Sequence, residues 1–206
     1  TAMDEQIGRL RGRLRELGVA RDTMFWFCSD NGPEGTEQSE TSPGSAGPFR
    51  GRKRSLFEGG IRVPGLLEWP ARIPKGRKTR FMACTSDFYP TILDALGLEP
   101  PAEQPRPIDG ISLMPVINGT AAERPAPIAF ETQGDRRATR GSPRLAWVEN
   151  RYKLLTDLDG GEEFLFDFAE DLSESVNLIE KMPERAAKMR RQLAAWRASC
   201  AESFAG

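Results

Sequence analysis

The chain of 206 residues has few cysteines, almost no net charge and no long apolar run. Its three cysteines form no disulfide framework, and their odd number leaves at least one of them unpaired within the chain. A net charge of −1 argues against a nucleic-acid-binding protein that relies on phosphate contacts. Because no long apolar span is present either, we expect neither nucleic acid nor a membrane among the partners of this chain.

The remaining composition is ordinary for a soluble globular protein, with 38% hydrophobic and 29% charged residues. The length is sufficient for one sizeable core, or for a core and a small second domain. The cysteines are then expected to be small buried hydrophobic residues, Cys28 in particular, because it lies within an apolar run.

Residues 24–32, Met-Phe-Trp-Phe-Cys-Ser-Asp-Asn-Gly, are the most informative segment. The apolar part is aromatic-rich, is too short for a helix and follows a separate helical pattern, which predicts a buried strand of a parallel sheet. In open α/β sheets the ligand crevice lies at the carboxyl ends of the strands, where Asp30 and Asn31 would lie. Their oxygens are hard ligands suited to Ca²⁺ or Mg²⁺, and Gly32 lets the backbone turn away. Without further context, a strand followed by a common Asn-Gly turn explains the same residues.

The organisation around this segment is that of an α/β unit. Apolar residues at helical spacing over residues 3–18 predict an amphipathic helix that Thr1 and Asp4 cap at its start and Gly18 ends. A long polar loop over residues 32–48 follows the first strand, and a second short strand is predicted at residues 65–69. A helix capped by Ser86 and Asp87 is expected to end before Gly97, and a short one to cover residues 113–118.

The pattern changes near residue 126. Short candidate strands at residues 128–131, 145–149, 152–156 and 164–167 are joined by polar turns. A last helix follows, and its apolar face needs a sheet to pack on. That face consists of Met182, Ala186, Met189, Leu193 and Trp196. The sequence therefore predicts a small antiparallel sheet covered by one helix.

Several motifs follow one another in order along the chain. They are Ser-Asp-Asn-Gly at 29–32, Gly-x-Lys at 51–53, Glu-Gly-Gly-x-Arg-Val-Pro at 58–64, Trp-Pro-x-x-Ile-Pro at 69–74, Asp-Gly-Ile-Ser-Leu-Met-Pro at 109–115, Arg-Tyr-Lys-Leu at 151–154 and Leu-Phe-Asp at 165–167. In this order and spacing they closely resemble the formylglycine-dependent sulfatases, which hydrolyse sulfate esters and belong to the alkaline-phosphatase superfamily. The likeness runs over nearly the whole chain.

Parts of the family pattern are missing. The family's nucleophile is a Cys in a Cys-x-Pro-x-Arg motif that is oxidised to formylglycine, and none of Cys28, Cys84 and Cys200 has that context. The paired N-terminal Asp ligands are missing too, and the chain has no histidine, which sulfatases use beside the nucleophile. Since the chain also begins at Thr1, we expect a C-terminal fragment of a larger sulfatase whose missing N-terminal part would supply formylglycine. Alone it is expected to be catalytically inactive and marginally folded.

The resemblance implies roles for three residues. Asp30 and Asn31 match two ligands of a Ca²⁺ site, which this chain leaves incomplete because Ca²⁺ prefers about six to eight oxygens. Lys53 matches the catalytic lysine that sulfatases direct at the substrate sulfate, and a compact ammonium suits a tetrahedral anion. The alternative for Lys53 is a solvated loop lysine without a role.

The basic cluster around Lys53 has a second interpretation, a nucleic-acid or localisation patch. It consists of Arg50, Arg52, Lys53 and Arg54. A glycine interrupts the cluster and no second basic segment supports it, which favours an anion pocket. Arg52 departs from the small residue, often Gly, at that place in the family, which would alter the shape of the pocket. We expect Glu58 and Arg62 to brace the following turn as an ion pair, and Trp69, Trp147 and Trp196 to be core residues.

The predicted fold class is therefore α/β, the later half of an alkaline-phosphatase-like α/β sandwich domain over residues 1–125 with a C-terminal subdomain over 126–206. The predicted function of the parent is hydrolysis of sulfate monoesters, sulfated glycans among them, with formylglycine and Ca²⁺. Two alternatives are a phosphoester or phosphonate hydrolase of the same superfamily and a non-catalytic carbohydrate-binding remnant. Family membership further implies an exported or lysosomal location.

Overall fold

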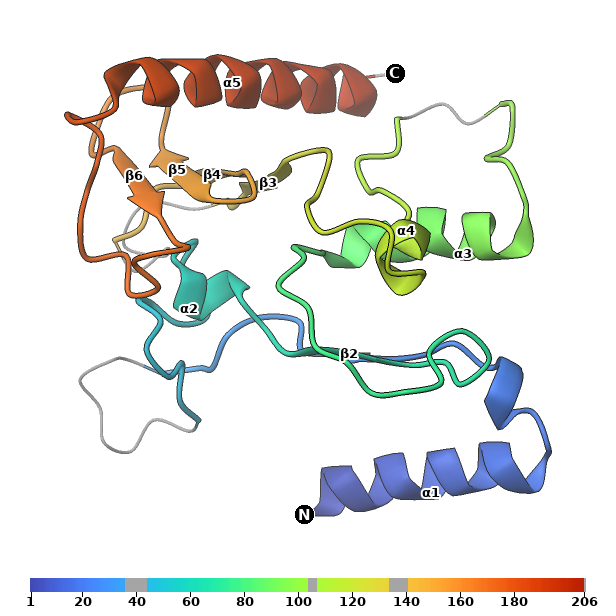
Figure 1. Ribbon diagram of the computed structural model, residues 1–206. Coiled ribbons are helices and arrows are strands. Elements are labelled where there is room, and N and C mark those ends of the chain that lie inside the picture. The colour runs from blue at the N-terminus through green and yellow to red at the C-terminus, as the bar shows by residue number, and fades with distance from the viewer. Residues whose placement is uncertain (36–43, 104–106, 134–140, 206) are drawn as a thin grey trace.

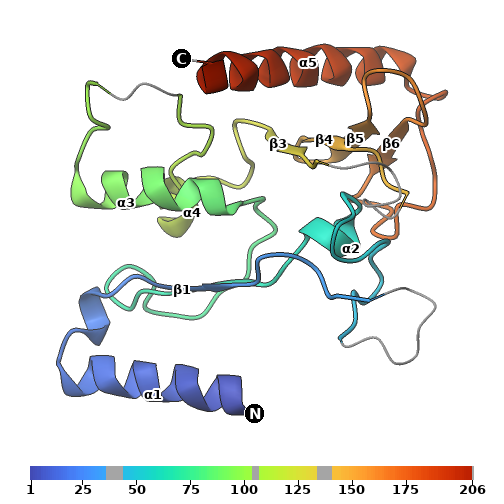
Figure 2. The same cartoon turned by 180° about the vertical axis from the view of Figure 1, so that it is seen from behind.

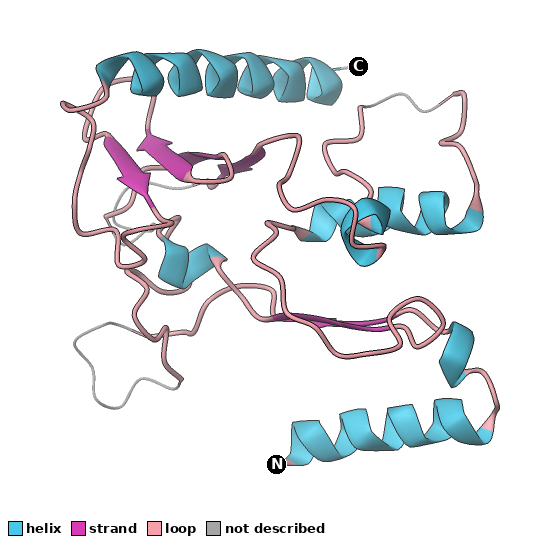
Figure 3. Cartoon of the chain, viewed as in Figure 1, coloured by secondary structure: helices cyan, strands magenta, loops and turns pink. Residues whose placement is uncertain are grey.

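The computed structural model of the chain describes residues 1–35, 44–103, 107–133 and 141–205 (Figure 1). It is a mixed α/β structure with two antiparallel sheets (Figure 3). Within these residues no helix combines the length and the apolar character needed to cross a membrane. In chain order the elements are α1 (Ala2–Glu16), β1 (Phe25–Cys28), α2 (Glu58–Ile61), β2 (Gly65–Glu68), α3 (Phe88–Leu96), α4 (Met114–Ile117), β3 (Ile128–Glu131), β4 (Leu145–Val148), β5 (Tyr152–Thr156), β6 (Phe164–Asp167) and α5 (Pro183–Ala205), with 3₁₀ turns at Ala20–Asp22 and Thr85–Asp87.

The first helix, α1, is as the sequence predicts except at its start. Gly18 follows the helix with φ +71°, the left-handed conformation that glycine adopts without strain. Thr1 is the N-cap residue, but its side chain makes no capping hydrogen bond, so the predicted capping box is wrong. The helix buries none of its residues, and a 2.5 Å ion pair from Arg11 to Glu68 connects it to β2.

Strand β1 differs from its prediction in both pairing and burial. It pairs antiparallel with β2, Phe25 opposite Glu68 and Cys28 opposite Gly65, rather than in a parallel sheet. The reason is where the chain returns: the Gly32 N–H donates to the Gly60 carbonyl at 2.8 Å, which places α2 beside the carboxyl end of β1. A chain that re-enters there must run back along β1. The β1 residues are half-buried.

The cysteines differ from their prediction in the same way. Cys28, Cys84 and Cys200 are all free thiols, and each is half-buried instead of buried. Cys28 shares the half-burial of its strand, β1, whose only partner strand in the described part of the chain is β2.

The second sheet has the order β3-β4-β5-β6, with each strand antiparallel to the next in the chain. The four predicted strands are confirmed, apart from Glu149 at the end of β4. Side chains alternate between the two faces, as the pleat requires. On the face toward α5 (Figure 1) the core comprises Leu145, Trp147, Leu154, Leu165, Ala186, Met189 and Leu193, and on the opposite face it comprises Ala146, Leu155, Phe166, Leu56 and Phe57. The predicted apolar face of the last helix is thus confirmed.

Both faces of this sheet are therefore covered, one by α5 and the other by the segment that leads into α2. Leu56 and Phe57 come from the first predicted unit yet share a core with β4, β5 and β6. A third core lies between β1, β2 and α4 and contains the buried Trp69. Seen from behind, α3 and α4 lie between the β1–β2 pair and the layer of α5 (Figure 2). The division of the chain at residue 126 stays a prediction.

Helix α3 ends where the sequence predicts but is not capped as predicted. Gly97 closes it with φ +65°. The Asp87 side chain does not cap α3; it accepts hydrogen bonds from the backbone N–H groups of Cys84 and Ile111, at 2.8 and 2.9 Å. Arg124 completes the arrangement with an ion pair of 2.7 Å in which both side chains are at most 1% exposed. Asp87 therefore connects α3 to the chain after α4.

Candidate active site

The turn after β1 is closed by its own hydrogen bonds and then packed on α2. The Ser29 hydroxyl donates to the Asn31 carbonyl at 2.9 Å, and the Asn31 amide nitrogen donates to the Gly32 carbonyl at 3.1 Å. At Gly32 an added Cβ would lie 1.8 Å from the Gly59 carbonyl oxygen, far inside van der Waals contact. Only glycine fits there, because two backbone segments touch.

Gly32→Ala is therefore expected to lower the free energy of unfolding by about 1–3 kcal/mol or more, the cost of overpacking a site that cannot relax. The control is Gly65→Ala, because no atom lies within 4 Å of a Cβ added there and it should change stability by less than about 0.5 kcal/mol. Urea denaturation of both variants measures the difference. Equal stability of the two would show that the turn and α2 do not touch.

Asp30 and Asn31 offer oxygens that fit part of a site for a hard cation. Asp30 is exposed, and among the described residues its carboxylate accepts a single hydrogen bond, of 3.4 Å, from the Ser29 hydroxyl. The Asn31 side-chain oxygen accepts no hydrogen bond from the described part of the chain. Carboxylate and amide oxygens are the ligands Ca²⁺ prefers, but two fall short of the roughly six to eight it takes. Over the described ranges no cluster of three or more His, Cys, Asp or Glu is arranged to hold a metal.

Lys53 lies on a loop that is tied directly to this turn. Its backbone N–H donates to the Pro33 carbonyl at 3.0 Å, one residue after Gly32. Its side chain is 37% exposed, and its Nζ lies 3.8 Å from Glu34 Oε2. The same loop reaches α2, where the Gly59 N–H donates to the Arg50 carbonyl at 2.7 Å. The structure thus brings together the backbone segments that carry Asp30, Asn31 and Lys53.

Glu34 links Lys53 to a second cation. Arg54 donates to Glu34 Oε1 at 2.6 Å, and this hydrogen bond, with that of the Gly35 N–H and the nearby charges of Arg54 and Lys53, lowers the pKa of Glu34 from 4.5 to about 2. Arg54 itself has φ +78°, an unusual conformation for a residue with a side chain. Lys53 therefore lies within a small network of charges instead of extending alone into solvent.

Arg54→Ala is expected to raise the pKa of Glu34 back toward its ordinary value of 4.5, because the largest cause of the lowered value is removed. A carboxyl with a lowered pKa stabilises the fold above its unfolded pKa and loses that contribution as the pH falls through the folded pKa. The contribution of Glu34 should therefore disappear between about pH 4.5 and 2 in the wild type. A carboxyl NMR titration measures the shift, with the exposed Arg80→Ala as control. An unchanged pKa in Arg54→Ala would refute the pairing.

Arg52 is a structural residue of the loop. It is 8% exposed, and its guanidinium donates to the carbonyls of Glu34 and Gly44, at 2.8 and 3.0 Å. It therefore holds together the two chain segments on either side of residues 36–43. The sequence raised the question of how an arginine fits where the family often has glycine. The structure shows that the guanidinium of Arg52 turns toward backbone carbonyls and bonds to them.

The sequence missed a buried ionic cluster beside α2. The predicted ion pair of Glu58 and Arg62 is confirmed at 3.2 Å. In addition, Lys153 on β5 is fully buried, with its Nζ 3.0 Å from Glu58 and 2.8 Å from Glu174. Burial raises the pKa of Glu174, and the charge of Lys153 opposes that rise. The signals in the sequence were a lysine within a largely apolar strand and the Arg-Tyr-Lys-Leu motif at residues 151–154, and neither of them names the partners of Lys153.

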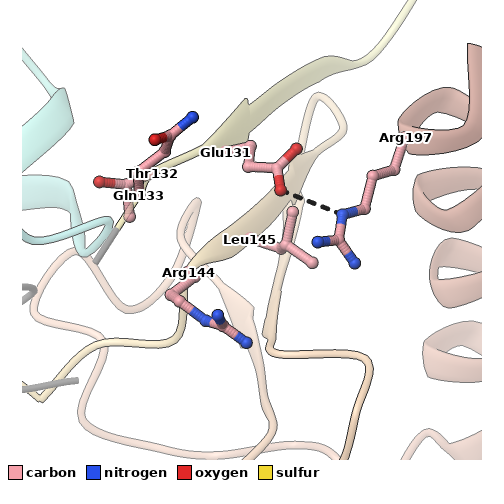
Figure 4. A pocket seen from close by; sticks show the side chains of 6 residues that line it. All are labelled: Glu131, Thr132, Gln133, Arg144, Leu145 and Arg197. Atoms are coloured by element: carbon pink, nitrogen blue, oxygen red, sulfur yellow. Dashed lines mark hydrogen bonds and ion pairs between the residues drawn. The ribbon is translucent and has the colours of Figure 1, made fainter. Parts of the chain in front are cut away.

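The hollow shown in Figure 4 does not coincide with the candidate site around Asp30, Asn31 and Lys53. It has a volume of about 250 Å³ and includes none of the predicted site residues. Glu131 and Arg197, which line the hollow, are joined by a 3.0 Å hydrogen bond. Arg144, which also lines it, pairs with Asp157 and Asp159. The charged side chains of the hollow are therefore already compensated. The lining residues are Glu131, Thr132, Gln133, Arg144, Leu145 and Arg197.

The chain is similar in sequence to known proteins of one family. The family model described as Sulfatase matches residues 1–98. Over 124 residues the chain is 40% identical to N-acetylgalactosamine-6-sulfatase of Sus scrofa, covering 60% of this chain and 23% of that protein. Over 122 residues it is 41% identical to steryl-sulfatase of Mus musculus, covering 58% and 19%. The chain thus spans about a quarter or less of the length of these curated relatives.

Solved structures extend the similarity in fold to nearly the whole chain. Ps i-CgsB in complex with k-i-k-neocarrahexaose aligns with a TM-score of 0.78 and 24% identity, over 96% of this chain and 41% of that one. The PsFucS1 sulfatase of Pseudoalteromonas sp. aligns at 0.73 and 23%, over 95% and 41%. A phosphonate monoester hydrolase of Agrobacterium radiobacter aligns at 0.63 and 22%, over 95% and 39%. The predicted alkaline-phosphatase-like α/β fold is thereby confirmed.

Proposed function

This chain belongs to the sulfatase family, and from that premise we propose that it forms part of an enzyme that hydrolyses sulfate monoesters. The observation that carries the proposal is that two segments, the turn after β1 and the loop of Lys53, are held by the same helix, α2. The Asp30–Asn31 turn and the Lys53 loop both bond to α2 or to each other through backbone hydrogen bonds. The turn that carries Asp30 and Asn31 and the loop that carries Lys53 are therefore both held against one short helix, α2.

The chemistry assigned to these residues follows from their types. Asp30 and Asn31 would hold Ca²⁺ together with ligands from elsewhere, and a bound cation polarises the sulfuryl oxygens. Lys53 places a positive charge against a tetrahedral anion and stabilises charge that develops on its oxygens. Glu34, 3.8 Å from Lys53 Nζ, keeps the ammonium in place until an anion competes for it. None of the three cysteines lies in the Cys-x-Pro-x-Arg context of the formylglycine nucleophile.

Sulfated glycans are the proposed substrate class. A sulfatase named for N-acetylgalactosamine 6-sulfate, a sulfated sugar, is among the curated relatives, and a solved structure of the same fold holds neocarrahexaose. A location outside the cytosol, exported or lysosomal, stays a prediction from the family.

A second candidate function is hydrolysis of phosphonate monoesters. It is favoured by the similarity in fold to the phosphonate monoester hydrolase of Agrobacterium radiobacter. The two reactions share a hard cation and a tetrahedral anion, so Asp30, Asn31 and Lys53 serve both equally well. The nucleophile segment distinguishes them.

Sequencing the gene upstream of the codon for Thr1 tests the proposal. An in-frame Cys-x-Pro-x-Arg segment is the expected result, because formylglycine forms from that cysteine in sulfatases. A Ser or Thr nucleophile without that context would instead support a phosphatase-like relative. A start codon directly before Thr1 would contradict an active sulfatase and support the carbohydrate-binding remnant.

A further inference from the structure

Lys153 is a fully buried charged side chain that the proposed mechanism does not use. It is the second residue of β5, and its exposed fraction is 0%. Its ammonium lies between two carboxylates, 3.0 Å from Glu58 and 2.8 Å from Glu174, whose side chains are 8% and 0% exposed. A buried charge is retained only when it is paired and hydrogen-bonded, so these three residues depend on one another.

The cluster also fixes the backbone at the start of α2. A Glu174 carboxylate oxygen accepts a hydrogen bond of 2.6 Å from the backbone N–H of Glu58, the first residue of that helix. The Glu174 carbonyl in turn accepts a hydrogen bond of 3.2 Å from Arg50. Glu174 has φ +53°, a conformation rarely adopted by residues with a side chain. The surroundings therefore hold Glu174 in an uncommon backbone state that directs both of its acceptors at the loop and α2.

From α2 the contacts continue directly to the proposed site. The Gly60 carbonyl accepts the Gly32 N–H at 2.8 Å, immediately after Asp30 and Asn31. The Gly59 N–H donates to the Arg50 carbonyl, and the Lys53 N–H donates to the Pro33 carbonyl. A single series of hydrogen bonds thus runs from the buried cluster to the segments of all three proposed site residues.

The backbones of α2 and of the Lys53 loop are in close contact, with no room for an added Cβ between them. A Cβ on Gly59 would lie 2.0 Å from the Gly51 carbonyl oxygen, and one on Gly60 would lie 2.0 Å from that of Ser55. Backbones in such close contact cannot slide independently, because the packed interior is nearly incompressible. A displacement of α2 is therefore passed on to the turn and to the Lys53 loop.

We propose that Lys153, Glu58 and Glu174 are positioning residues: they lock α2 against the C-terminal sheet and thereby set the place of Asp30, Asn31 and Lys53. That Asp30, Asn31 and Lys53 form a catalytic site rests on the proposed function. That the three buried residues fix the position of these segments rests on the contacts alone. None of the three residues is required to touch a substrate. Their role is to fix the platform on which the metal-binding turn and the lysine loop rest.

Hydrogen exchange of the 206-residue chain, read amide by amide by NMR, tests this without any enzymatic assay. In Lys153→Met the buried carboxylates of Glu58 and Glu174 lose the cation that they share, although Glu58 keeps its ion pair with Arg62, so α2 should open locally more often. The amides of Gly32 and Lys53, which bond to Gly60 and Pro33, are expected to exchange at least about tenfold faster. The Leu178 amide, which bonds to Leu165 of β6, reports on the sheet and should keep its protection. Lys153→Arg should restore slow exchange at Gly32 and Lys53.

The matched control is Arg124→Met, which breaks the other buried ion pair, that of Arg124 with Asp87. It should speed exchange at Ile111, which bonds to Asp87, and leave Gly32 and Lys53 unchanged. If Lys153→Met fails to fold, Glu174→Gln answers the question, because it keeps an acceptor for the Glu58 N–H but removes a charge. The proposal is overturned if Gly32 and Lys53 exchange as in the wild type, or if Leu178 loses protection to the same degree. Neither result depends on whether the protein hydrolyses sulfate esters.

Discussion

Asp30→Ala is expected to abolish Ca²⁺-dependent hydrolysis of sulfate esters in a sulfatase that contains these residues. The substitution would remove a charged ligand of the cation, and a hard-cation site depends strongly on ligand charge. Asn31→Ala should impair activity less, because a neutral ligand is lost. Steady-state hydrolysis of an aryl sulfate over a range of Ca²⁺ concentrations measures both effects.

The matched control for Asp30→Ala is Asp4→Ala, because Asp4 is an exposed aspartate in the first turn of α1. It should retain wild-type turnover. The assignment of Asp30 fails if Asp30→Ala still turns over at the wild-type rate in the presence of a chelator.

Lys53→Ala is expected to lower kcat by roughly a hundredfold or more, the scale observed when a group that stabilises an oxyanion is removed. The reason is that a fixed ammonium stabilises charge that appears only in the transition state. A change confined to KM would instead mean that Lys53 binds sulfate equally in the ground and transition states. The same aryl sulfate assay separates the two parameters.

Lys75→Ala provides the comparison for Lys53→Ala, because Lys75 is an exposed lysine of the loop that follows β2. It should change neither kcat nor KM. If Lys53→Ala behaves like Lys75→Ala, Lys53 is a solvated loop residue without a catalytic role.

The C-terminal sheet was predictable because its information is local. Alternating apolar residues in β4, β5 and β6 belong to two faces that the structure buries separately, and the spacing of Ala186, Met189 and Leu193 marks the helix face that covers one of them. The ion pair of Glu58 and Arg62, expected as a brace of the turn, was predictable for the same reason, because the two residues are only four positions apart.

The direction of β2 and the role of Lys153 could not be derived from local pattern. The pairing of β1 with β2 depends on a contact between Gly32 and Gly60, and both glycines look like ordinary turn residues in the sequence. Lysine in a strand usually faces solvent, and the partner Glu58 of Lys153 lies 95 positions away. For Asp30, Asn31 and Lys53 the sequence motifs name the residues and the structure shows that their segments meet, while their roles remain predictions.

The relative rates of hydrolysis of an aryl sulfate and of a phosphonate monoester with the same leaving group distinguish a sulfatase from a phosphonate hydrolase. The protein to use is one of the length of the curated relatives that contains these 206 residues, assayed with Ca²⁺ and with a chelator. We expect the larger kcat/KM for the sulfate ester and the loss of turnover in the presence of the chelator. Faster hydrolysis of the phosphonate ester, or sulfate turnover no greater than a buffer blank, would contradict the proposed hydrolysis of sulfate esters.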